Sequence, residues 1–491
     1  MIRRWSPALT AVLVFGAAGC SQTARRPDVD EKVQPADYRS PIAAGSTRPS
    51  ALAIAPVPAP PEWSGPQPVD VFIRRALAEN RTVQAAYHNV QALKHRIPQV
   101  TTLDDPFASN AIFPIPSVAP QYSLMGYNPY NLTLAQQFPW FGTLGLRGEV
   151  AARDVQVALA ELAAAQVDAV EAVKRAYYNL YASLKIEEIL TENRKILEDF
   201  RGIALERLAA GGTQRDVLRS EVLISELDRE KANNKQAITS ARSALARQLH
   251  VSPETDFRTL PELSLAGAST DFERLYQLAV AARPELQGRL AAVARDEKAI
   301  ELARKRFYPN VTLGLTYMDM EKTNAMTPKT AGGMPNVGLF VAFNLPVYRN
   351  KYRAGVYEAQ ERTLADARLY EAQRDETAGE IQDFMVQVKT QQGVLALLRE
   401  SILPRTKESF RLARSDYAKT NVDYALVQSA LREVLQVQLQ ITQVEAELGK
   451  AVASLERAVG TEINEHPPAT VAAAAVPPAP ATASPFQPKP R

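Results

Sequence analysis

The sequence predicts a mixed α/β membrane protein in which long antiparallel helical hairpins adjoin four β-strands per chain. Three observations lead to this fold class. An order of helix, strand pair and long helical hairpin occurs twice, and 207 positions separate both Pro139 from Pro346 and Asp216 from Asp423. The strand-like segments alternate apolar with small or polar residues. The helix-like segments carry apolar residues at alternating steps of three and four, so we expect two internal structural repeats built on coiled-coil hairpins.

Composition and motifs argue against several classes of protein. The chain has 491 residues, 46% of them apolar and 23% charged, and its net charge of +3 gives no reason to expect nucleic acid. It contains no GxSxG, Walker A or dinucleotide-binding motif. His88 and His95 lie a heptad apart, where a solvated helix face is a better interpretation than a weak metal pair. We therefore expect no enzyme, no cofactor and no bound metal.

The first residues have the pattern of a signal peptide, which we place at residues 1–19. Arg3 and Arg4 precede a short apolar run that ends in small residues directly before Cys20, the sole cysteine. This resembles a bacterial lipoprotein signal that is cleaved before a lipidated Cys20; an ordinary signal beside a chance cysteine is the alternative. Ser21, by the same resemblance, favours the outer membrane. Residues 20–68 then read as a Pro-rich tether, and residues 464–491 as a disordered Pro/Ala-rich tail.

The first repeat is expected over residues 69–259. We expect Pro98 to end its first helix, and the spacing of Thr213 and Asp216 to form a cap close to a capping box. The expected elements are a helix, a loop, two strands and two long helices, namely Val69–Arg96, Thr101–Pro120, Gln121–Tyr127, Asn131–Phe138, Gly148–Leu208 and Gln214–Leu249.

The second repeat is expected over residues 260–463 in the same order. We expect its first helix to break at Arg283-Pro284, its long helix to kink at Pro404, and its return helix to end at Gly460. The expected elements are the helix Asp271–Phe307, strands over Asn310–Met320 and from Val337 to Leu345, the long helix Tyr352–Tyr417 and the return helix after Thr420-Asn421.

The alternating strands are the strongest indication of a membrane. Apolar residues on one face suit contact with lipid, while the intervening small or polar residues suit a water-filled lumen. The alternative is a half-buried strand of a soluble sheet. The candidate lipid-facing residues are Val311, Leu313, Leu315, Val337, Leu339, Val341 and Phe343. Because four strands cannot close a barrel, the chain would have to assemble with cyclic symmetry. The charged helices would project into water.

Three segments resemble the outer-membrane efflux protein (TolC) family: AQQFPWFGTLGLRGEVA (135–151), LAAGGTQRDVLRSEV (208–222) and, more loosely, YAKTNVDYALVQSAL (417–431). The resemblance covers roughly Pro66–Gly460. It implies a homotrimer with a shared twelve-stranded β-barrel in the outer membrane and an α-helical tunnel in the periplasm. It also implies two partners, a periplasmic adaptor (membrane fusion) protein and an inner-membrane pump of the RND type. The channel would be the passive outer-membrane conduit of a tripartite efflux pump.

The same resemblance places the candidate sites at the two helical tips. Gly211, Gly212 and Thr213 in the first turn, with Thr420 and Asn421 in the second, would contact the adaptor. Asp216 and Asp423 would form carboxylate rings at the pore constriction, which favour cations; ordinary helix N-terminal charge is the alternative. Three positions depart from the family pattern. Thr420 stands where glycine is common, Ser429 where a further aspartate is frequent, and Thr143 where a lysine is common after the Pro-Trp corner.

Aromatic residues lie near the expected strand ends, where a membrane-interface girdle and packing at the strand-to-helix junction are both open interpretations. These residues are Tyr127, Tyr130, Trp140, Phe141 and Tyr348.

Two alternative functions also fit the sequence. The first is the outer-membrane channel of a type I protein secretion system. The second is a lipid-tethered periplasmic coiled-coil scaffold without a pore, in which the strands form a small soluble sheet.

Overall fold

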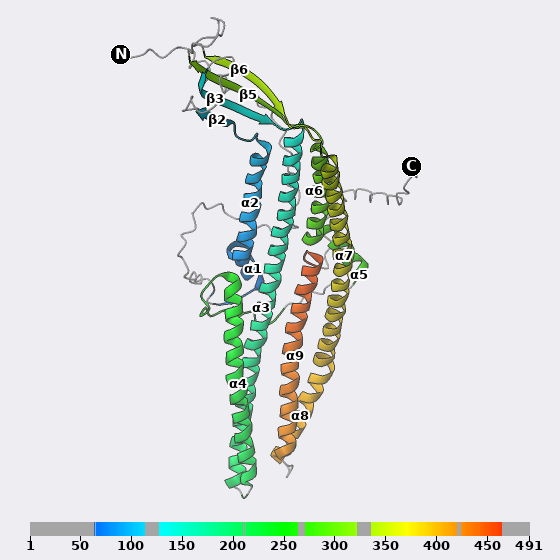
Figure 1. Cartoon of the computed structure of the whole chain (residues 1–491). Coiled ribbons are helices and arrows are strands. Elements are labelled where there is room, and N and C mark those ends of the chain that lie inside the picture. Colours follow the sequence, from blue (N-terminus) through cyan, green and yellow to red (C-terminus); the bar gives the residue numbers. More distant parts are fainter. Residues whose placement is uncertain are drawn as a thin grey trace, which may run out of the picture.

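The computed structural model is an elongated molecule with a β-sheet at one end and the tips of two helical hairpins at the other (Figure 1). It describes Trp63 and residues 65–112, 127–209, 211, 213–263, 271–321, 335–419 and 424–463. The signal peptide, Cys20, most of the expected tether, most of the strand Gln121–Tyr127 and the C-terminal tail lie outside these residues.

The first half of the chain contains eight of the described elements. A two-residue parallel ladder joins β1 to β4 next to the first helices. The elements are β1 (Pro66–Gln67), α1 (Val69–Glu79), α2 (Arg81–Thr101), β2 (Phe107–Ile112), β3 (Tyr127–Phe138), α3 (Thr143–Ala209), α4 (Gln214–Leu249) and β4 (Arg258–Thr259).

Three expectations for this half are wrong. The helix Val69–Arg96 is broken at Asn80, whose extended backbone and side-chain oxygen cap α2 by accepting from the amides of Thr82 and Val83. Pro98 lies inside α2, because one missing amide donor in the last turn does not stop the helix before Thr101. The expected loop over 101–120 contains β2.

The second half of the chain also runs from two helices through two strands to long helices. The predicted break at Arg283-Pro284 is confirmed, since α5 ends directly before it and α6 begins at Pro284. A π-helical segment, Leu397–Ile402, precedes Pro404 and accommodates the proline that we expected to kink the helix. The elements are α5 (Phe272–Ala282), α6 (Pro284–Lys305), β5 (Val311–Glu321), β6 (Asn336–Phe343), α7 (Arg349–Ala396), α8 (Leu403–Lys419) and α9 (Tyr424–Val459).

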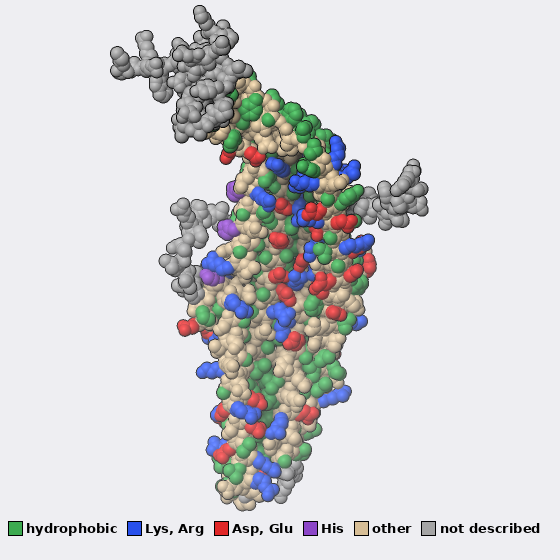
Figure 2. Space-filling model, in the orientation of Figure 1, with side chains coloured by type: hydrophobic (Ala, Val, Ile, Leu, Met, Phe, Trp, Pro, Cys, Tyr) green, Lys and Arg blue, Asp and Glu red, His purple; other side chains and the backbone are tan. Residues whose placement is uncertain are grey.

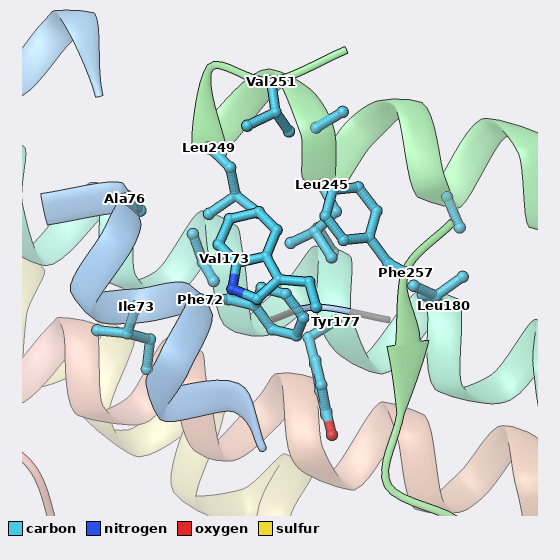
Figure 3. Close-up of a cluster of buried hydrophobic side chains, with 14 of the residues drawn as sticks. Phe72, Ile73, Ala76, Val173, Tyr177, Leu180, Leu245, Leu249, Val251 and Phe257 are labelled. Atoms are coloured by element: carbon cyan, nitrogen blue, oxygen red, sulfur yellow. The ribbon is translucent and has the colours of Figure 1, made fainter. Parts of the chain in front are cut away.

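A buried cluster holds α1 against the long helices α3 and α4 (Figure 3). Phe72 of α1 lies between Tyr177 and Phe257 at ring-centroid distances of 6.0 and 5.7 Å. Val173, Tyr177 and Leu180, three positions of the predicted heptad seam, are fully or almost fully buried here. Burial of several such side chains, each contributing roughly 1.5–3 kcal/mol, fixes the middle of the first hairpin.

A second cluster plays the same part in the other half of the chain. Leu275 of α5 packs with Ile381 and Val388 of α7 and with Leu448 and Leu455 of α9. The return helix α9 ends at Gly460, whose positive φ of 82° and close approach to the backbone of Arg283 both require glycine. The predicted end of this helix is confirmed.

Candidate functional site

The four longer strands form one antiparallel sheet in the order β2-β3-β5-β6. The register separates its side chains into two sets, because Leu134 faces Leu315 and Leu315 faces Leu339. One face is therefore largely apolar, with Gln136 and Asn110 as polar members. Its apolar residues are Leu132, Leu134, Phe138, Val311, Leu313, Leu315, Tyr317, Val337, Leu339, Val341 and Phe343. All seven predicted lipid-facing residues lie on this face, which we call the apolar face.

The apolar face is exposed within the single chain. Leu339 is 87% exposed, Val337 66% and Leu313 47%. Figure 2 shows hydrophobic side chains over the sheet at its end of the molecule. Contiguous exposed apolar residues of this extent are uncommon on a water-soluble monomer and mark a surface that contacts lipid or another protein.

The opposite face of the sheet carries small and polar residues. The hydroxyls of Thr133 and Thr316 lie 3.4 Å apart across β3 and β5. The ring of Phe340 covers Gly314, so that a Cβ at position 314 would stand 2.2 Å from ring carbons. The remaining members include Asn131, Gln137, Thr312, Asn336, Gly338 and Ala342.

The sheet ends on both sides at an unpaired strand. Among the described residues, β2 pairs with β3 alone and β6 pairs with β5 alone. Each edge therefore presents a row of backbone amide and carbonyl groups without a strand partner. An edge of this kind is compatible with a membrane only when a strand of another chain completes it.

Aromatic residues join the sheet to the helices. Trp140 stacks on Tyr308 with centroids 5.0 Å apart and planes 11° from parallel. The backbone amide of Trp140 donates to the side chain of Asn310 at 3.3 Å, and the amide of Asn310 donates to Asn344 at 2.6 Å. Phe141 and Tyr348 remain exposed, at 79% and 75%. Trp140 is thus part of the packing between sheet and helices, whereas Phe141 and Tyr348 lie at the surface and could contact lipid.

The first helical tip contains the turn between α3 and α4. Gly211 has a φ of 97°, and its amide donates to the carbonyl of Leu208. Thr213 is the N-cap residue of α4, but its side chain makes no capping hydrogen bond, so the expected cap is not formed. Asp216 lies in the first turn of α4, where its charge complements the helix dipole. Gly212 lies outside the described residues.

At the second tip, Thr420, Asn421 and Asp423 are outside the described residues, but the helices on either side are described. Phe200 of α3 packs with Tyr417 of α8 and Tyr424 of α9. Arg207 of α3 lies over the Tyr417 ring and donates a hydrogen bond to the Tyr417 carbonyl oxygen. These contacts connect the two hairpins of one chain close to their tips.

Asp216 is electrostatically connected with this aromatic contact. The pKa of Tyr424 is raised to about 12, chiefly by burial and in smaller part by Tyr417 and the Asp216 carboxylate, while a hydrogen bond with Ser220 opposes the change. Burial and Asp216 also raise the pKa of Tyr417, while Arg207 opposes the change. The Asp216 carboxylate therefore acts electrostatically on both Tyr417 and Tyr424. Sequence reasoning did not single out these two tyrosines, because they lie on separate helices, α8 and α9, and no helical period relates them.

An open groove lies beside the first tip. It is lined by Arg215, Leu218, Arg219 and Val222 of α4 and by Gln428 of α9. Leu218 and Val222 are 53% and 58% exposed. Apolar side chains flanked by arginines form a surface that suits an amphipathic helix.

The described ranges contain neither a metal-binding cluster nor a helix suited to cross a membrane. No group of three or more His, Cys, Asp or Glu side chains there is placed to hold a metal ion. None of the helices described is both long and apolar enough to cross a membrane.

Comparisons with known proteins agree with this geometry. The model of the outer membrane efflux protein family matches residues 275–461. The solved outer-membrane channel OprN superposes with a TM-score of 0.66 at 20% identity, covering 80% of this chain and 89% of that chain. VceC of Vibrio cholerae gives a TM-score of 0.66 at 16% identity, covering 81% of this chain and 97% of that chain. The open-state MtrE channel of Neisseria gonorrhoeae gives a TM-score of 0.63 at 18% identity, covering 81% of this chain and 89% of that chain. None of the curated proteins matches the chain.

Proposed function

Because the chain belongs to the outer membrane efflux protein family, we propose that it is the outer-membrane channel of a tripartite efflux pump. The observation that carries the proposal is the open sheet of the described residues, which has an exposed, largely apolar face, an opposite face of mainly small and polar residues, and two edges without a strand partner. In this role the chain performs no reaction and needs no cofactor. It is a passive conduit.

Three copies would complete the membrane-spanning part. Four strands from each chain give a twelve-stranded barrel when β6 of one copy pairs with β2 of the next. Every backbone group at the edges then has a partner, which removes a cost of several kcal/mol per unpaired group in hydrocarbon. The apolar face would contact lipid, and the face that carries Thr133 and Thr316 would line the lumen.

The helices would continue the conduit as a tunnel in the periplasm. Their charged residues favour contact with water on the outside and in the lumen. The two halves, residues 69–259 and 260–463, would be copies of an ancestral repeat that each supply two strands and one hairpin. Cys20, freed by removal of residues 1–19, would carry the lipid anchor in the outer membrane, with residues 20–68 as its tether and residues 464–491 as a free tail.

The tips would contact the periplasmic adaptor, behind which stands an inner-membrane pump of the RND type. We assign this contact to Gly211, Gly212, Thr213, Thr420 and Asn421. The groove of Leu218 and Val222 lies directly beside the first turn and offers a surface for an adaptor helix.

Asp216 and Asp423 are our candidates for the pore constriction. Threefold symmetry would make each a ring of carboxylates. Replacement of both by alanine is expected to lower the preference for cations, which the reversal potential in asymmetric KCl measures. An unchanged reversal potential would assign both residues to helix stabilisation instead.

The pore-less scaffold is the principal alternative, and the apolar face argues against it. A soluble sheet would cover such a face with helices, whereas Leu339 and Val341 are 87% and 62% exposed.

Adjacent residues of β6 offer a matched test. Leu339→Arg places a charge on the apolar face, at a cost of roughly 2–4 kcal/mol in the middle of a membrane. Gly338→Arg places the same charge on the opposite face, where nothing lies within 4 Å. We expect detergent-extracted trimers from the native chain and Gly338→Arg, and a strongly reduced yield from Leu339→Arg, by native mass spectrometry of outer-membrane fractions. A detergent-independent monomer that tolerates both changes equally would refute the channel.

A further inference from the structure

Six cationic side chains gather where the helices meet the sheet. Arg304, Lys305 and Arg306 stand at the end of α6, five to seven residues before β5 begins at Val311. Arg349, Lys351 and Arg353 open α7, six or more residues after β6 ends at Phe343. We call these six residues the basic collar. Figure 2 shows Lys and Arg side chains directly beneath the hydrophobic sheet.

The collar has no acidic counterpart among its neighbours in sequence. Residues 302–310 and 344–357 contain no Asp or Glu, and none of the six cations forms an ion pair with any other residue in the described ranges. Further along the helices the pattern changes, since Lys298 bonds to Glu149 and Glu301, and Arg362 bonds to Glu358. The end of the helices that adjoins the sheet therefore carries six neighbouring cations without an acidic partner in the described structure.

Helix stabilisation explains only half of the collar. Arg304 and Lys305 in the last turn of α6 complement the negative end of its dipole. Arg349, Lys351 and Arg353 stand instead at the N-terminus of α7, where positive charge is unfavourable and acidic residues are preferred. Helix stabilisation therefore does not account for the three cations of α7, of which Lys351 lies 6.0 Å from the centre of the Tyr352 ring.

Aromatic rings accompany the collar at the same level. The position of a Cβ on Gly142 would lie 3.6 Å from the Lys305 ammonium, so this lysine reaches the turn that carries Trp140 and Phe141. Tyr348 precedes Arg349, and Phe141 is 79% exposed. Exposed aromatic rings beside Lys and Arg are the composition found at the boundary between hydrocarbon and lipid headgroups.

We propose that the basic collar binds the phosphate groups of anionic phospholipids at the helical-side boundary of the membrane. The inference rests on the proposed function, because it requires the apolar face to lie in lipid. Each collar cation would approach a headgroup phosphate while Phe141 and Tyr348 lie among the acyl carbonyls. The contact would fix the depth of the barrel, since apolar face, rings and cations follow one another along the chain's long axis.

A second copy of the chain is the competing partner. Asp104 and Asp105 precede β2 at the opposite edge of the sheet, so a neighbouring chain would bring them toward the β6 edge and the α7 half of the collar. They would not reach the α6 half equally, because α6 leads into β5, an interior strand. Lipid phosphate accounts for both halves.

Trp140 provides a local reporter for the test. In a Trp5→Phe, Trp63→Phe background it is the remaining tryptophan of the chain. The full-length protein is reconstituted into vesicles of phosphatidylglycerol and phosphatidylcholine, with bromine on the acyl chains of one lipid at a time. Quenching of Trp140 fluorescence then measures which lipid occupies the collar.

We expect brominated phosphatidylglycerol to quench about fivefold more effectively than brominated phosphatidylcholine at equal mole fraction, which is roughly what one cation at an anionic surface supplies. The variant R304Q/K305Q/R306Q/R349Q/K351Q/R353Q is expected to abolish the preference, and R349Q/K351Q/R353Q to reduce it. The control R229Q/K235Q/K407Q removes exposed cations from α4 and α8 and is expected to keep the preference for phosphatidylglycerol.

Four results would overturn the proposal. Equal quenching by both lipids in the native chain, or a preference that survives in the six-residue variant, refutes the collar while leaving the channel intact. If the native chain shows no lipid preference and the R349Q/K351Q/R353Q variant no longer forms a trimer, these cations contact a neighbouring copy instead. Absence of quenching by either lipid refutes the membrane-embedded sheet itself, and the proposed function with it. Native mass spectrometry of each variant confirms that the protein compared is assembled.

Discussion

The guanidinium carbon of Arg207 lies 3.9 Å from the centre of the Tyr417 ring. The two residues belong to α3 and α8, which are otherwise parts of different hairpins, and the same arginine donates a hydrogen bond to the Tyr417 carbonyl oxygen. Near the tips this contact holds together hairpins that diverge toward separate turns (Figure 1).

Removal of this contact should loosen the tip without unfolding the chain. A cation–π contact at a partly exposed site contributes about 0.5–1 kcal/mol, so Arg207→Gln is expected to increase amide hydrogen exchange roughly two- to fivefold over residues 410–417. Arg414→Gln is the matched control, because Arg414 lies farther from its ring, at 5.9 Å from Phe200. Equal exchange in both variants would show that Arg207 does not connect the hairpins.

Gly314 is expected to tolerate no side chain opposite Phe340. Gly314→Ala would place a Cβ 2.2 Å from the ring and displace it, with a loss of about 1–3 kcal/mol in stability. Thermal unfolding of the assembled protein measures the loss. Gly338→Ala, on the adjacent strand, meets nothing within 4 Å and should be nearly neutral.

The double variant Gly314→Ala, Phe340→Ala distinguishes crowding from other causes. If the ring is the obstacle, truncation of Phe340 should recover part of the stability that Gly314→Ala loses. Additive losses in the double variant would mean that the glycine serves some other purpose in the strand.

Gly460 should be more sensitive than the glycines inside the helices. Its φ of 82° and a separation of 2.8 Å between its Cβ position and the Arg283 Cα make Gly460→Ala strained in two ways. We expect a loss above about 2 kcal/mol. Gly379→Ala in α7 has open space and should instead stabilise the helix by up to about 1 kcal/mol. Chemical denaturation of both variants tests the contrast, which a similar response would contradict.

The carboxylate of Asp366 should make stability depend on pH. Burial, and then a hydrogen bond with Asp296, raise the pKa of Asp366, while Arg295 opposes the change. The folded state therefore binds this proton more readily than the unfolded state. Stability contributed by the protonated form is present below the ordinary pKa near 3.8 and is lost as pH rises through the raised value.

We expect Asp366→Asn to flatten the decline of melting temperature with rising pH just above pH 4. The exposed Asp199 has no ion pair in the described structure, so Asp199→Asn should leave the profile unchanged. A profile that Asp366→Asn does not alter would assign the slope to another group, such as Asp154, whose pKa burial also raises.

The sequence predicts the long helices and three of the strands, Asn131–Phe138 among them, because their patterns are regular. Alternation over Val311–Tyr317 and Val337–Phe343 is confirmed in the register of β5 and β6. The break before Pro284 follows from proline's restriction on the preceding residue. The break between α1 and α2 at Asn80 has no comparable sequence signal. Only tertiary contacts distinguish an asparagine that caps a helix from one inside a helix.

Strand β2 and the aromatic contact at the tip were missed for related reasons. The segment Phe107–Ile112 is short, contains Ser and Asn and lies between prolines, and it becomes a strand through its pairing with β3. Tyr417 and Phe200 are 217 positions apart, and their proximity is a property of helix packing rather than of local sequence. The roles of the tip residues Gly212, Thr420, Asn421 and Asp423 remain predictions.

Single-channel recording tests the central claim most directly. Detergent-purified trimers of the native chain and of an Arg207→Gln, Tyr417→Leu variant are added to a planar lipid bilayer. A conduit predicts discrete current steps, with the variant open at least as often as the native chain because its tip is loosened. Intact trimers that insert yet give no current steps in either form would contradict the claim that this protein is a channel.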